Sequence, residues 1–158
     1  MKKVIVRANV GEVFEIKTPN GYGYFQITHI HSERPKFGHL IRVVGEFASQ
    51  QENAEALAGM PTKFKIFFPA ADALKKGLIR SAGSAVIPKE DVAFPLFRNG
   101  TRDPKTKQIA DWWLWDGTKE WRVGKLSKEQ YSLPQPAVVN DTLLAQRIAE
   151  GWTNESYR

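Results

Sequence analysis

The chain has 158 residues, of which 42% are hydrophobic and 25% are charged, a composition typical of a soluble globular protein with one core. It contains no cysteine, which excludes disulfide bonds, and its formal net charge is +6. The apolar run near the first residues is interrupted at Arg7 and Asn9, so it is too short for an export signal, and no run approaches a membrane span. We therefore expect one cytoplasmic domain over residues 1–158.

The first part of the chain predicts three consecutive strands. Residues 11–18 alternate apolar and charged side chains, the period of a half-buried strand. Pro19, Asn20 and Gly21 then supply the residues of a tight turn. Residues 22–31 and 39–47 are rich in aromatic and β-branched residues, which favours two further strands of a meander.

Two short helices are predicted to interrupt the strands. Ser49 and Glu52 have the spacing of a capping box, which predicts a helix that ends at Gly59. Residues 62–68 alternate again and predict a strand. Pro69 is suited to the first turn of a second short helix, which the segment 75–77 would end.

The second half contains a hairpin and a terminal helix. Residues 83–95 predict an irregular connection, and residues 99–110, which are almost free of apolar side chains, predict an exposed and mobile loop. Residues 111–126 predict a hairpin around an Asp-Gly turn, and Asn140 caps a helix that extends through Glu150. The expected fold class is α+β: a mostly antiparallel bent sheet or SH3-like barrel, with a few short helices and a C-terminal helix.

The sequence contains no recognisable catalytic set. Its serines lack a nucleophile elbow, and no glycine-rich loop precedes a helix in the way phosphate binding requires. His29, His31 and His39 lie on neighbouring predicted strands and could ligate zinc, but three ordinary histidines are the simpler interpretation. We therefore expect a protein that is not an enzyme and that holds no metal or cofactor.

Four of the five tryptophans lie in the predicted hairpin. Such a cluster is either part of the core or an aromatic recognition surface. In a strand, Trp113 and Trp115 share one face while Trp112 lies on the other, and Trp121 stands across the turn. The only later basic cluster precedes them, at Arg98, Arg102, Lys105 and Lys107. We expect Trp113 and Trp115 to face the core. The expected partner-binding residues are Arg98, Arg102, Trp112 and Trp121.

Several segments resemble a known family. Residues 11–16 and 21–27 are similar to the start of the immunity protein 26 family of bacterial polymorphic toxin systems, and residues 94–97, 113–117, 140–144 and 151–152 are compatible with the rest of its pattern. The resemblance implies a cytoplasmic immunity protein that binds and neutralises a cognate toxin by occlusion, without catalysis. The positive charge of the chain favours a toxin with an acidic surface patch.

Two other functions stay open. A small basic nucleic-acid-binding module would use tryptophan stacking and the basic cluster to contact bases and phosphates. A metal-dependent enzyme would be built around the three histidines.

Overall fold

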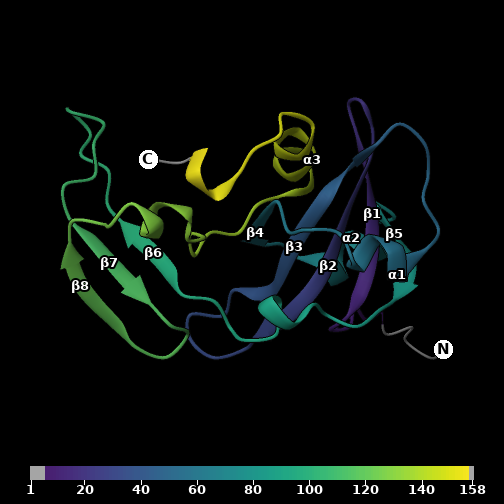
Figure 1. The fold of residues 1–158 in the computed structure, drawn as a ribbon, viewed down its shortest axis with the longest axis horizontal. Coiled ribbons are helices and arrows are strands. Elements are labelled where there is room, and N and C mark those ends of the chain that lie inside the picture. The colour runs from purple at the N-terminus through teal and green to yellow at the C-terminus, as the bar shows by residue number, and fades with distance from the viewer. Residues whose placement is uncertain (1–5, 157–158) are drawn as a thin grey trace.

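The computed structural model describes residues 6–156, and these form two antiparallel sheets with three α-helices (Figure 1). Residues 1–5, which include the start of the N-terminal apolar run, lie outside the described part. Within residues 6–156 the two sheets are separate and open, and they do not close into an SH3-like barrel. The expected α+β class with antiparallel sheets is confirmed.

The large sheet has five strands in the order β4-β3-β2-β1-β5, each antiparallel to its neighbours. The meander and the following strand are confirmed, but β5 was not predicted. Its polar, glycine-containing sequence is exposed over most of its length, so it lacks the alternation that marks a strand. The strand bounds are β1 Glu12–Thr18, β2 Gly21–His31, β3 Gly38–Phe47, β4 Phe64–Phe67 and β5 Ile79–Ser84.

Helices cover both faces of the large sheet. Helix α3 (Asp141–Ala149) places Leu144 and Ile148 on a core that includes Phe25, and α2 (Ala70–Lys75) packs against the same cluster. Helix α1 (Ala54–Ala58) covers the other face, where Leu57 packs in the cluster that contains Tyr24. The amphipathic character of the three helices therefore accounts for the two apolar layers around one sheet.

The predicted start of α1 was wrong. Its cap is Asn53, whose Oδ1 accepts a hydrogen bond from the Ala56 N–H at 3.1 Å, and not Ser49. The segment before the cap is held elsewhere, because the Gln51 N–H donates to the Tyr24 hydroxyl at 2.6 Å. The predicted caps at Asn140 and Gly59 are confirmed, since Asn140 accepts from Leu143 N–H at 2.8 Å.

The small sheet has three strands: β6 (Phe97–Gly100), β7 (Trp112–Trp115) and β8 (Glu120–Gly124), in that order. It stands beside the large sheet along the long axis of the molecule (Figure 1). Aromatic rings fill the junction between the sheets, with Phe67 of β4 stacked on Phe97 of β6 at a centroid separation of 5.3 Å. The 3-10 helices are η1 (Lys89–Asp91), η2 (Glu129–Ser132) and η3 (Asn154–Ser156).

Asn154 ties the two sheets together. Its side chain bonds the backbone of Lys65 in β4 twice, accepting from the N–H at 3.0 Å and donating to the carbonyl at 3.1 Å. Its own carbonyl accepts a hydrogen bond from Arg98 of β6 at 2.6 Å. The buried Asn154 therefore makes two hydrogen bonds of the kind that a neighbouring strand would make to β4, and it also holds β6 of the small sheet.

Candidate functional site

The tryptophan hairpin has one buried and one exposed indole on each face. Cross-strand pairing places Trp113 opposite Arg122, and Leu114 opposite Trp121. Trp112 and Trp115 are only 3% and 7% exposed, whereas Trp113 is 38% and Trp121 is 40% exposed. The prediction that Trp115 faces the core is confirmed. The predictions that Trp112 is a surface anchor and that Trp113 is buried were wrong.

Trp115 is buried because it lies in the junction between the sheets. Its indole contacts His31 at a centroid separation of 5.0 Å, Phe97 at 5.1 Å and Phe37 at 5.4 Å. Trp113 lies on the same face of β7, but farther from the large sheet, so the aromatic cluster does not cover it. The alternation of the strand assigned both indoles to one face correctly, but the aromatic cluster that buries Trp115 does not extend over Trp113.

Trp112 is buried on the opposite face together with Arg98. The Arg98 guanidinium carbon lies 5.1 Å from the Trp112 ring centroid and 5.6 Å from that of Tyr131. Arg98 Nε donates to the Leu133 carbonyl at 3.0 Å, and the whole side chain is inaccessible to solvent. The prediction that Arg98 binds a partner at the surface is therefore contradicted: this cation holds the C-terminal segment against β6.

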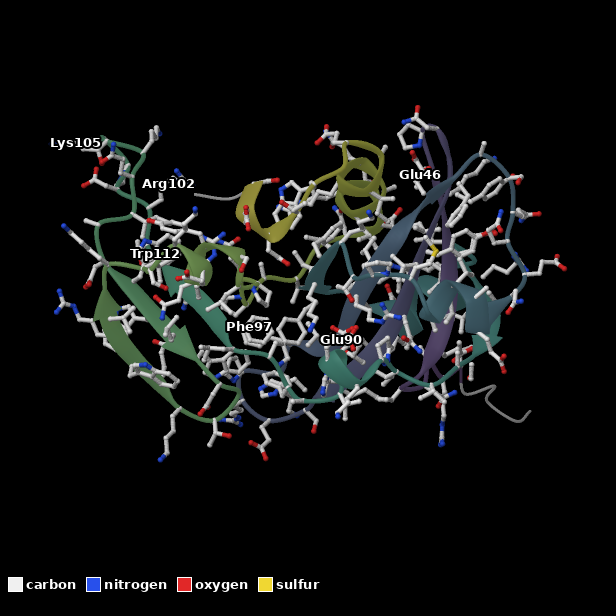
Figure 2. The ribbon with its side chains drawn as sticks, in the orientation of Figure 1. Glu46, Glu90, Phe97, Arg102, Lys105 and Trp112 are labelled. Atoms are coloured by element: carbon white, nitrogen blue, oxygen red, sulfur yellow. The ribbon has the colours of Figure 1, made fainter. Side chains whose placement is uncertain are left out.

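The predicted loop at residues 99–110 is mostly exposed from residue 101 onward and contains a hydrogen-bonded turn, but its expected start was wrong, because Asn99 and Gly100 belong to β6. The Asp103 carboxylate accepts hydrogen bonds from the N–H groups of Thr106 and Lys105, and these bonds lower its pKa. Arg102 is half-buried and donates to the Lys107 carbonyl. Figure 2 shows Arg102 and Lys105 where this loop projects beyond the end of the small sheet, with Trp112 at its base. We call residues 101–110 the basic loop.

A row of exposed side chains crosses the small sheet next to the basic loop. Asn99, Trp113 and Arg122 are direct cross-strand neighbours on β6, β7 and β8, and all three are exposed. Arg122 Nε donates to both carboxylate oxygens of Asp111 at 2.8 Å, and this carboxylate raises the pKa of the guanidinium. The exposed row therefore presents an indole beside a fixed cation, a pair common in protein-binding hot spots.

The three histidines do not form a metal site. His39 lies opposite Ile30 in the sheet, so it faces away from its proposed companions His29 and His31. His29 Nε2 donates to the Val92 carbonyl at 2.8 Å, and burial lowers its pKa although that bond acts in the other direction. In residues 6–156, no three histidine, aspartate or glutamate side chains are grouped as metal ligands.

A charged network around the buried Glu15 of the large sheet was missed by the sequence reasoning. Glu15 accepts hydrogen bonds from Tyr24 at 2.6 Å, from Gln50 at 3.0 Å and from Arg80 at 2.9 Å. Burial acts to raise the Glu15 pKa, but the three donors and the Arg80 charge outweigh it, so the pKa is lowered. The pKa of Tyr24 is raised to about 12 by burial and by this carboxylate. Because the Glu15 carboxylate already accepts hydrogen bonds from three side chains of the protein, we assign it a structural role.

One groove lies far from the hairpin. It has a volume of about 760 Å³ and is lined by apolar side chains, among them Val10, Ala58, Val86 and Ile87. Val86 is 89% exposed, so the groove is open to solvent on one side. None of its lining residues was expected from the sequence to bind a partner.

Comparison of the chain with models of known families, with curated protein sequences and with solved structures finds no significant match. Among the residues that the structure describes, no helix has both the length and the apolar character needed to cross a membrane.

Proposed function

We propose that this protein is a cytoplasmic, non-catalytic immunity protein that binds a cognate toxin and occludes it. The observation that supports this proposal is the exposed row beside the basic loop. Trp113 offers a large apolar contact that is 38% exposed in the free protein, and Arg122 is held next to it by Asp111. An indole and an arginine that a partner can desolvate together are typical of the centre of a protein interface.

The charge around the row favours a partner with an acidic patch. Lys105 and Lys107 are exposed in the basic loop. Arg102 lies between Lys105 and Trp112 of the small sheet (Figure 2). Such cations accelerate encounter with an acidic surface, and the indole then supplies the buried contact. Of the four partner-binding residues expected from the sequence, Arg102 and Trp121 keep an accessible position, and Trp113 replaces Trp112.

Nucleic-acid binding is the second candidate, since an exposed indole beside cations also suits base stacking and phosphate contact. The exposed carboxylates of Asp111 and Glu120 flank Arg122 on the same hairpin. A nucleic acid carries a phosphate at every nucleotide and meets these carboxylates, whereas a protein can confine its acidic patch to the basic loop, so the surface of the hairpin suits a protein better than a nucleic acid.

The test is protection from a toxin. Each protein encoded by a gene adjacent to this one is co-expressed with the chain as a toxin candidate, and both growth and binding of the purified pair are measured. Trp113→Ala should lose protection and weaken binding by about 30-fold or more, the size expected for a hot spot. Val86→Ala, an exposed apolar truncation on the other side of the molecule, is the matched control and should protect like the unmodified chain.

Two results would contradict the proposal. One is full protection by Trp113→Ala combined with Lys105→Glu and Lys107→Glu, because the proposed surface would then be unnecessary. The other is micromolar binding of labelled single-stranded DNA or RNA that falls steeply with salt and depends on the same residues. That second result would establish the nucleic-acid alternative.

A further inference from the structure

Two of the sheet edges are occupied by other parts of the chain. The edge of β4 bonds Asn154 through Lys65, and Phe67 exchanges backbone hydrogen bonds with residues 137 and 139. The edge of β6 is occupied at Arg98, whose N–H donates to the Pro134 carbonyl at 2.9 Å. Natural proteins commonly cover or distort sheet edges, because an open edge is a template for another strand.

The other two edges differ from each other. Strand β5 is distorted by a register shift against β1, and helices α1 and α2 contact it. Strand β8 is the last strand of the small sheet, and its outer edge has no backbone hydrogen bond to any residue in the described part of the chain. All of its first three side chains, Glu120, Trp121 and Arg122, are exposed. This edge is therefore available to a strand from another molecule.

We propose that β8 pairs antiparallel with β8 of a second copy of this protein, forming a homodimer with a continuous six-stranded sheet. The choice of a second copy as the partner follows from the residues of β8 itself. In an antiparallel pair, two opposed residues direct their backbone groups either both toward the partner strand or both away from it. These directions alternate along a strand, so two copies of β8 can pair only in every second register.

Trp112 pairs with Gly124 and Trp113 pairs with Arg122, so Val123 between them is a bulge and the regular part of β8 is residues 120–122. Three of the allowed registers have their centre in this part. A register centred on Glu120 places two carboxylates opposite each other, and one centred on Arg122 places two guanidinium groups together. Like charges in directly opposed positions destabilise a sheet. The register centred on Trp121 instead places each Glu120 opposite Arg122 of the second copy.

The side chains needed for this register are free to make it. The Glu120 carboxylate has no hydrogen bond or ion pair among residues 6–156. Arg122 uses Nε for Asp111, which leaves its two terminal nitrogens to reach a second carboxylate. Trp121 is 40% exposed, and on its face the two indoles would pack together beside Leu114 of each copy. One face of the paired β8 strands is then aromatic, and the other face carries two ion pairs.

The dimer goes beyond the proposed function, because it uses the edge of the sheet and leaves Trp113 exposed on the sheet face. We expect weak association that depends on concentration. The regular pairing covers only a few residues, well below the roughly 1,600 Å² that a stable complex typically buries.

The experiment is sedimentation of the full chain over a wide concentration range, with charge-exchange variants. The unmodified protein should shift from monomer to dimer. Glu120→Arg alone and Arg122→Glu alone should each weaken dimerisation by about tenfold or more, because each places like charges opposite each other. The chain with both substitutions should dimerise again, and an equimolar mixture of the two single variants should form a heterodimer. Glu33→Arg makes the same charge change in the loop before β3 and should have no effect.

One single variant could fail to dimerise because it is less stable than the unmodified chain. The mixture distinguishes this case, because the two single variants should regain dimerisation when they are combined. A monomer at every concentration would overturn the proposal. So would a dimer that is insensitive to both single exchanges. Trp113→Ala should leave the dimer intact, so a failure of the toxin proposal and a failure of this one are separate results.

Discussion

Truncating two tryptophans of the same strand should have opposite consequences for stability and binding. Trp115→Ala removes a ring that is 7% exposed and touches four other rings in the junction. A covered aromatic side chain buries roughly 150–250 Å², which at about 25 cal/mol per Å² corresponds to about 4–6 kcal/mol. Because part of this area is already buried in the unfolded chain, we expect a loss of about 3–5 kcal/mol in the free energy of unfolding.

Trp113→Ala is the matched substitution on the same face of β7. Its indole is 38% exposed and leaves no enclosed cavity when it is removed, so we expect a loss of about 1–2 kcal/mol. For a chain of this size, 1 kcal/mol corresponds to a change of about 2–4 °C in Tm. Trp115→Ala should therefore lower Tm by about 6–20 °C, and Trp113→Ala by about 2–8 °C.

The assay is urea and thermal unfolding of both variants, followed by circular dichroism, with toxin binding measured on the same preparations. Trp113→Ala should lose binding while it keeps its fold, and Trp115→Ala should lose stability first. Equal destabilisation by the two substitutions would refute the reasoning, because it would mean that the junction does not end between the two residues.

The remaining predictions concern the large sheet. Arg42→Met should reduce the free energy of unfolding by about 3–5 kcal/mol in urea denaturation, because the buried guanidinium donates to Gln26 at 2.9 Å and to the Met60 carbonyl at 3.1 Å, and these acceptors would be left unsatisfied. A loss below about 1 kcal/mol would show that water replaces these bonds. Glu15 has a lowered pKa in the folded state, so its contribution is present above its ordinary pKa of 4.5 and is lost as the pH falls through the folded value. Glu15→Gln should therefore be less stable at neutral pH and show a weaker loss of stability in acid, and an unchanged acid profile would contradict this assignment.

The parts of the fold that could be predicted from sequence are those with strong local signals. Alternation identified β1 and β4, the aromatic and β-branched content of β2 and β3 completed the meander, and Asn140 identified the start of α3. Ser49 satisfied the spacing of a capping box, yet Asn53 caps α1, because the Tyr24 hydroxyl holds the chain between them in an extended conformation. Tyr24 belongs to a distant strand, and a local pattern contains no information about it.

The candidate site was harder to predict because its residues differ only in what covers them. Arg98 and Arg102 lie in one basic cluster of the sequence, but Arg98 is enclosed by Trp112 and the segment after β8, whereas Arg102 stands at the base of an exposed loop. Alternation along β7 places Trp113 and Trp115 on one face correctly. Which of them meets solvent depends on the position of the large sheet, and that is a property of tertiary packing alone.

The joint made by Asn154 has a consequence for how the protein is made. Asn154 follows every strand of both sheets in the sequence, so the ribosome has completed both sheets before the residue that joins them is available. At about 5–20 residues per second, the nascent chain passes an interval in which each sheet can form while the aromatic rings between them still face water. During that interval the rings of Phe67, Phe97 and Trp115 can meet other chains as readily as each other. We therefore expect closure of the joint to be a step of biosynthesis that is sensitive to aggregation.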